Sequence, residues 1–172
     1  MISDLRLISI KEVTPKSVLK QFDCDISALN EFLSRYAIKN NDLGIGKTFV
    51  ALDNRNRVVG YFTLATAQVA YQEIPSEYKG KLPKYPIPAL RIARLAVNKD
   101  MKGKGIGRWL LTQAFLKTLQ VADITGLYLI IVDAKETSKG FYEHYGFQKF
   151  LDIDLSYFIL IDTVRKATQQ KT

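Results

Sequence analysis

The segment from Lys102 to Arg108, KGKGIGR, combines glycines at alternate positions with basic side chains. Its glycines are Gly103, Gly105 and Gly107. Closely spaced glycines that open a helix let backbone N–H groups approach an anion, and the helix dipole adds partial positive charge. The side chains of Lys102, Lys104 and Arg108 would place cations beside it. The segment therefore predicts a site for a phosphorylated ligand.

Two other phosphate-binding motifs do not fit this chain. The dinucleotide fingerprint needs a glycine where Arg108 stands, and no acidic residue closes a strand about twenty residues further on. Gly46-Lys47-Thr48 looks like the end of a P-loop, but the opening glycine would fall on Asn41. The residues that follow, TFVALD, favour a strand, whereas a P-loop needs a helix there. We interpret this segment as a turn that enters a strand.

An apolar strand precedes the glycine loop and an amphipathic helix follows it, and hydrophobic periodicity predicts the remaining elements. Four prolines within residues 71–90 predict a long loop, suited to substrate contacts or to crossing the surface. Asp25 or Ser27 could cap the first helix. The strands at 90–97 and 127–132 would be parallel, joined by a right-handed crossover. We predict strands at 5–10, 47–52, 57–69, 90–97, 127–132, 147–151 and 157–161, helices at 25–38, 105–122 and 137–145, and a polar loop at 40–46.

Composition limits the class of protein. The 172 residues are 47% hydrophobic, enough for one domain with a substantial core, which we place at residues 1–162 with a fraying polar tail at 163–172. No apolar run approaches about twenty residues and no signal peptide opens the chain, so we expect a cytoplasmic protein without a membrane contact. A single Cys24 and a single histidine make a disulfide or a metal site improbable.

The net charge of +8 and the pI near 9.5 come from basic residues spread along the chain. A basic domain attracts polyanions, and nucleic acid is the commonest one in cells. The same charge could instead serve an anionic cofactor and solubility. Charge alone leaves both interpretations open.

Three motifs together resemble the GCN5-related N-acetyltransferases (GNAT). The loop that begins at Lys102 is similar to their pyrophosphate loop, in which the first residue is Gln or Arg. Arg94–Val97 resembles their fourth strand, and Phe141–Phe147, FYEHYGF, resembles their C-terminal motif. The motifs stand in the family's order between residues 49 and 147. The resemblance implies a single α/β domain with a mixed, mostly antiparallel sheet, splayed parallel central strands and flanking helices.

The resemblance also implies acetyl-CoA as cosubstrate, no metal, and a set of site residues. Tyr142 matches the family's general acid, and a phenol with a pKa near 10 can protonate a thiolate whose conjugate acid lies near 8.5. The residues that match the family's acetyl-CoA contacts are Leu95, Ala96 and Val97 through their backbone, Lys102, Gly103, Lys104, Gly105, Ile106, Gly107 and Arg108 in the loop, and Ser138, Phe141 and Tyr142.

Other polar residues near these motifs are weaker candidates. Tyr145 competes with Tyr142, and His144 has neighbours that suggest a surface position. Asp133 ends a strand, where it could reach a cleft or cap the next helix. No carboxylate is obviously placed as a general base. An α-amine with a pKa of about 7.7 to 8.0 would need little help, whereas a lysine near 10.4 would need more.

Further segments resemble one branch of the superfamily, the tRNA-acetylating toxins of bacterial toxin–antitoxin modules. They are FDCD at 22–25 leading into LNEFL at 29–33, the proline-rich LPKYPIP at 82–88, and VDAK at 132–135. Asp25 stands where these toxins usually have glycine. The resemblance implies aminoacyl-tRNA as the acceptor, a homodimer, and a small ribbon-helix-helix antitoxin.

Two alternatives remain open. The chain could be a GNAT enzyme that acts on a small-molecule or protein amine, without effect on translation. It could also be a non-catalytic module that keeps the fold to bind a partner, although Tyr142 and the intact loop disfavour this.

Overall fold

The computed structural model describes residues 1–170 and contains two compact units. The first consists of Met1–Ala65 and Ala93–Phe115, and the second of Thr66–Ile92 and the chain from Leu116 onwards. Strands β3 (Val58–Val69) and β4 (Ile87–Val97) and helix α4 (Ile106–Ala122) each run from one unit into the other.

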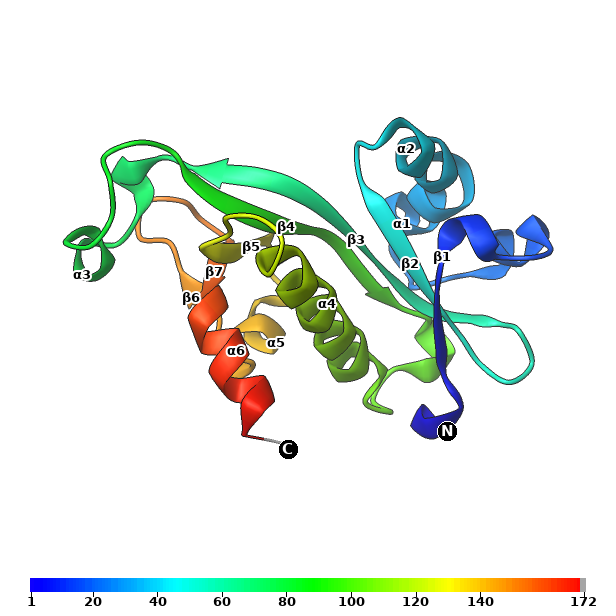
Figure 1. The fold of residues 1–172 in the computed structure, drawn as a ribbon. Helices are drawn as coiled ribbons and strands as arrows, with labels where there is room; N and C mark the ends of the chain where they lie inside the picture. Colours follow the sequence, from blue (N-terminus) through cyan, green and yellow to red (C-terminus); the bar gives the residue numbers. More distant parts are fainter. Residues whose placement is uncertain (171–172) are drawn as a thin grey trace. The chain divides into compact units, whose positions relative to one another are not determined.

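The strands form one seven-stranded mixed sheet in the order β1-β2-β3-β4-β5-β7-β6 (Figure 1). The parallel pairing joins Ala89–Ile92 of β4 to Leu129–Val132 of β5, while β4 itself continues to Val97. The pairs β1–β2, β2–β3, β5–β7 and β6–β7 are antiparallel. This confirms the predicted mixed sheet. The other strands are β1 (Arg6–Ser9), β2 (Lys47–Leu52), β5 (Leu129–Asp133), β6 (Gln148–Lys149) and β7 (Ser156–Leu160).

The N-terminal helix is longer than predicted. It consists of α1 (Ser27–Glu31), a π-helical turn (Phe32–Tyr36) and α2 (Ala37–Leu43), and it ends at Gly44, whose φ of +75° suits glycine. The predicted loop at 40–46 is therefore helical at its start, because the buried Asn41 side chain accepts a hydrogen bond from the Thr48 N–H at 3.1 Å. Asp25 and Ser27 do not cap the helix; Ile26 holds that position without a side-chain hydrogen bond.

The C-terminal segment also differs from the prediction of a fraying tail. Helix α6 (Ile161–Gln169) includes the buried Ile161 and Val164, which lie one turn apart, and Arg165 forms an ion pair with Asp123 at 2.8 Å. These contacts fix a segment whose composition is mostly polar. The predicted boundary at residue 162 thus falls inside a helix, and residues 171–172 of the predicted tail lie outside the described residues.

The remaining elements match the sequence prediction to within a few residues. The proline-rich segment contains the short helix α3 (Ser76–Lys79), and β4 begins at Ile87, earlier than expected. Helix α5 (Lys139–His144) ends before Gly146, whose φ is +93°. The predicted strand at 147–151 shortens to β6. Among residues 1–170, no helix is both long and apolar enough to cross a lipid bilayer.

Each unit has its own apolar core. In the first unit, Phe32 and Leu33 of the N-terminal helix pack with Val50 of β2 and with Tyr61 of β3, whose hydroxyl donates to the Leu29 carbonyl at 2.8 Å. In the second, β4 and β5 contribute Ala89, Leu129 and Ile131, which pack with Phe150 and Phe158. These cores hold the strands from which the candidate site residues project.

Candidate active site

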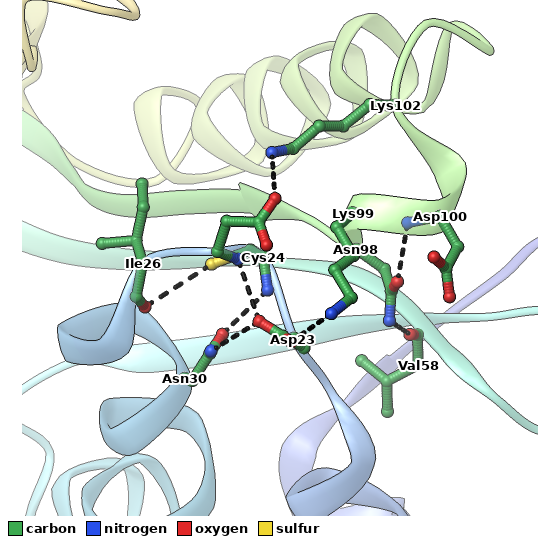
Figure 2. Close-up of polar contacts among 10 residues, drawn as sticks. Asp23, Cys24, Ile26, Asn30, Val58, Asn98, Lys99, Asp100 and Lys102 are labelled. Carbon is green, nitrogen blue, oxygen red and sulfur yellow. Dashed lines mark hydrogen bonds and ion pairs between the residues drawn. The ribbon is translucent and has the colours of Figure 1, made fainter.

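The chain leaves β4 through a turn that is fixed by Asn98. The Asn98 N–H donates to the Val59 carbonyl at 2.9 Å. The Asn98 side-chain oxygen accepts from the Asp100 N–H at 3.1 Å (Figure 2). A short 3-10 turn, Lys99–Met101, follows and delivers the chain to Lys102. The start of the glycine loop is therefore tied to the start of β3.

Two loop glycines have left-handed backbone conformations. The φ angles of Gly103 and Gly105 are +75° and +81°, which side chains disfavour. A Cβ atom on Gly103 would meet no other atom within 4 Å, so the backbone conformation and not crowding requires glycine there. A Cβ on Gly105 would lie 3.0 Å from Ile2 Cδ1, a tight contact with the end of an exposed side chain.

The backbone N–H groups from Gly103 to Arg108 have no acceptor among residues 1–170. The first helical hydrogen bond of α4 is donated by the Trp109 N–H to the Gly105 carbonyl at 3.0 Å. Six consecutive donors therefore stand at the positive end of a helix, and Lys102, Lys104 and Arg108 are exposed beside them. Such an arrangement of donors and cations is suited to a phosphate or pyrophosphate group.

A cavity of about 900 Å³ borders the same loop within the first unit. Lys104 and Ile106 line it together with the first residues of the chain and the turn between β2 and β3. Its volume lies in the range typical of small-molecule sites. The loop thus has space beside it for more of a ligand than a phosphate group.

The three predicted residues of β4 differ in exposure. Ala96 is buried, whereas Leu95 and Val97 are half-buried. A Cβ atom on Gly60 of β3 would lie 2.8 Å from the Ala96 carbonyl oxygen and 2.7 Å from Leu110 Cδ1. Gly60 therefore lets β4 and the start of α4 approach β3 closely.

Sequence reasoning missed a polar network that holds the loop from the N-terminal side. Asp23 accepts hydrogen bonds from Lys99 Nζ at 2.8 Å and from Asn30 Nδ2 at 2.9 Å, and Asn30 Oδ1 accepts from the Cys24 N–H at 2.9 Å (Figure 2). The hydrogen bonds that Asp23 accepts, first from Lys99 and then from the Asp25 N–H and Asn30, lower its pKa to about 2. Asp25, next to this network, forms an ion pair with Lys102. The only sequence signal was the FDCD motif itself.

Tyr142 lies in the second unit, on α5, with 5% of its surface exposed. Its ring makes edge contacts with Phe141 and Phe147, at centroid distances of 5.2 and 5.4 Å. Burial raises its pKa to about 12. Among residues 1–170, its hydroxyl has no hydrogen-bond partner. Every side-chain oxygen there that is fully shielded from solvent does have a partner, so the Tyr142 hydroxyl is not fully shielded. The hydroxyl is therefore accessible and able to donate to a ligand.

Helix α5 is held at both ends. The Ser138 hydroxyl accepts from the Lys135 N–H at 3.0 Å, and the Phe147 N–H donates to the Tyr142 carbonyl at 3.1 Å. The buried Tyr157 of β7 donates its phenol hydrogen to Glu143 Oε1 at 2.9 Å. Tyr157 is a second residue that sequence reasoning missed, and it fixes the helix that carries Tyr142.

The weaker candidates have other partners. Asp133 forms an ion pair with Arg91 and does not cap α5, whose N-cap is Ser138. His144 is exposed and its ring packs on Tyr145, which in turn contacts Phe141. In the part of the chain that the structure describes, no three His, Cys, Asp or Glu residues gather as metal ligands.

Comparison with known proteins identifies relatives. A sequence profile described as an acetyltransferase (GNAT) domain matches residues 44–149. A tRNA-acetylating toxin of Mycobacterium tuberculosis (strain ATCC 25618 / H37Rv) is 30% identical over 139 residues, which cover 80% of this chain and 82% of that toxin.

Solved structures share the fold over nearly their whole length. AtaT complexed with acetyl-methionyl-tRNAfMet superposes with a TM-score of 0.88 at 24% identity, over 96% of this chain and 99% of that one. An AtaT mutant bound to the C-terminus of the antitoxin AtaR and to acetyl-CoA superposes with a TM-score of 0.79 at 21% identity, over 97% and 99%. At these identities the likeness shows the fold.

Proposed function

This chain belongs to the acetyltransferase (GNAT) family, and from this premise we propose that it is a toxin that acetylates the α-amine of aminoacyl-tRNA and so blocks translation. As a GNAT enzyme it is an N-acetyltransferase with acetyl-CoA as its cosubstrate. The observation that carries the choice of acceptor is the 30% identity to a tRNA-acetylating toxin over 82% of that toxin.

The glycine loop binds the pyrophosphate of acetyl-CoA in this proposal. Support comes from the six unpaired N–H groups between Gly103 and Arg108 and from the positive φ angles of Gly103 and Gly105. The backbone of Leu95, Ala96 and Val97 binds the pantetheine arm, and Ser138 and Phe141 contact the cosubstrate from α5. Acetyl-CoA supplies the thioester, and these residues hold and orient it.

Tyr142 donates a proton or a hydrogen bond to the departing thiolate. The acceptor amine forms a C–N bond to the acetyl carbonyl carbon, the C–S bond breaks, and the sulfur takes a proton. A phenol with a pKa of about 12 is protonated at cellular pH, so the acid is always loaded. With this pKa, Tyr142 is a weaker acid than an ordinary tyrosine and weaker than a thiol near 8.5, so full proton transfer from the phenol to the thiolate is uphill. The phenol therefore first donates a hydrogen bond to the sulfur. The proton that the attacking amine loses is the one that the thiolate finally gains.

The choice of acceptor agrees with the chemistry of the chain. No carboxylate is placed as a base by the sequence motifs, and Asp133 is paired with Arg91. An α-amine with a pKa near 7.7 to 8.0 is partly neutral at cellular pH and needs little help from a base. The net charge of +8 favours a phosphodiester chain as partner.

The same proposal includes partners and location. The enzyme is a cytoplasmic homodimer that a small ribbon-helix-helix antitoxin neutralises. The support is the resemblance to toxins of this class and the solved complex in which the related fold of AtaT binds the C-terminus of AtaR.

A transfer assay tests the acceptor. Labelled acetyl-CoA is added with the protein to charged tRNA, to the same tRNA after deacylation, and to free amines such as polyamines and lysine peptides. We expect label on charged tRNA alone, and a rate at least tenfold lower for Tyr142→Phe. Label on a free amine with none on charged tRNA would support the alternative, a GNAT enzyme for small-molecule or protein amines.

A further inference from the structure

An exposed ion pair lies at the entrance to the glycine loop. Asp25 Oδ2 is 3.1 Å from Lys102 Nζ, and the two side chains are 59% and 54% exposed. Lys102 is the residue immediately before the six unpaired N–H groups. One of the cations beside the anion site is therefore already bound to a carboxylate of the chain itself.

The position of Asp25 is built by its neighbours. The Asp25 N–H donates to Asp23 Oδ1 at 2.9 Å, and Lys99 binds Asp23 twice: its Nζ contacts Oδ2 and its N–H donates to the Asp23 carbonyl, both at 2.8 Å. The Lys102 N–H then donates to the Lys99 carbonyl at 3.4 Å. Figure 2 shows the contact between Asp23 and Lys99 and the ion pair of Lys102. The segments that carry the two ends of the ion pair are thus linked through Asp23 and Lys99.

A carboxylate at this position is a feature that the backbone does not require. Asp25 has a φ of +66°, a conformation that glycine adopts without strain. Among residues 1–170, the Asp25 carboxylate forms a hydrogen bond and ion pair with Lys102 alone, and it attracts the Lys99 ammonium at longer range. It therefore adds a negative charge next to a site for an anion and contributes no other contact.

We infer that Asp25 is an intramolecular counter-ion that competes with the pyrophosphate of acetyl-CoA for Lys102 and weakens cosubstrate binding. The inference rests on the assignment of acetyl-CoA to the glycine loop made above. Because both groups are exposed, water and salt screen the competition, and its effect on affinity is modest.

The experiment compares dissociation constants for acetyl-CoA, measured by calorimetry at low salt. Asp25→Asn keeps the size of the side chain and its tolerance of positive φ but removes the charge. We expect it to bind acetyl-CoA about two- to fivefold more tightly than the wild type, with the gain shrinking at high salt. Asp100→Asn is the matched control. Asp100 lies on the Lys99–Met101 turn, next to the loop, but forms no ion pair with Lys102, so we expect this variant to change the affinity less.

A double-mutant cycle isolates the competition. Lys102→Gln should weaken binding, and Asp25→Asn added to it should give no further gain. Unchanged or weaker binding by Asp25→Asn and by a second variant, Asp25→Gly, would overturn the inference, as would a gain of the same size in the Lys102→Gln background. The acceptor assay is independent of this test. If the double-mutant cycle gives the expected result but charged tRNA stays unlabelled, the counter-ion inference stands and the proposed acceptor is wrong.

Discussion

Tyr142 carries a prediction at the scale of single residues. Because its pKa is about 12 in the free protein, it stays protonated throughout the range in which the enzyme can be assayed. The rate should therefore rise as the acceptor α-amine loses its proton, near pH 7.7 to 8.0, and then stay level to about pH 9.5. Rapid-quench measurements between pH 6 and 9.5 outrun hydrolysis of the aminoacyl ester.

The control for this profile is Tyr142→Phe. It should lower the rate at every pH and leave the shape of the curve unchanged. A decline with a midpoint between pH 8 and 9.5 that disappears in Tyr142→Phe would show that the tyrosine ionises in that range and would contradict the assignment.

Asp23 carries a second residue-scale prediction. Its pKa in the folded protein is about 2, below the ordinary 3.8, chiefly because Lys99 donates a hydrogen bond to it. A depressed pKa means that the carboxylate stabilises the fold above about pH 4 and loses this effect as the pH falls toward 2. The melting temperature of Asp23→Asn should thus lie below that of the wild type at pH 7, and the gap should narrow markedly by pH 2.5. An equal gap at both pH values would sink the idea.

Single residues also show what the sequence could not predict. Tyr142 and the glycine loop could be proposed from the sequence because their chemistry lies in short contiguous motifs. The ion pair of Lys102 joins it to Asp25, 77 residues away, and Lys99 and Asp23 are similarly distant in sequence. Nothing in local periodicity indicates which of the 25 basic residues meets which carboxylate. Such pairings are fixed by the sheet, which brings the end of β4 beside the N-terminal segment.

At the scale of elements, the packing of β3 against its neighbours depends on Gly60. A Cβ atom there would lie 2.7 Å from Leu110 Cδ1, which can move, and 2.8 Å from the Ala96 carbonyl oxygen, which is backbone. We expect Gly60→Ala to lower the free energy of unfolding by about 1 to 3 kcal/mol. Urea unfolding measures this.

Gly80→Ala is the matched control for Gly60→Ala. Gly80 has a φ of −61°, which alanine adopts freely, and a Cβ atom there would meet no atom within 4 Å. Its stability should equal or slightly exceed that of the wild type. If both variants lose the same free energy, close approach at Gly60 is not the cause.

Element prediction was most accurate where apolar periodicity was strong, as in β2, β3, β5 and α4. It was wrong for α6, because only Ile161 and Val164 of that helix are buried and the intervening residues are polar. The prediction also ended the N-terminal helix too early. Asn41 is polar and was therefore expected in a loop, whereas tertiary packing buries it inside the helix. In each case, tertiary packing overrides local composition.

At the scale of the whole molecule, sheet order and family agree. Strand β4, the glycine loop, the parallel strand β5 and helix α5 follow one another in the chain, and the acetyltransferase profile covers all four. Composition alone left open whether the charge of +8 served a cofactor or nucleic acid. The identity to a tRNA-acetylating toxin favours an acceptor that is itself a polyanion.

The central claim is that the acetyl group goes to the α-amine of an amino acid esterified to tRNA. The most direct measurement treats charged tRNA with the protein and acetyl-CoA, hydrolyses the ester with mild base, and identifies the released amino acid by mass spectrometry. We predict an N-acetyl amino acid, formed with the wild type and strongly reduced with Tyr142→Phe. Unmodified amino acid alone, while acetyl-CoA is bound normally, would contradict the claim.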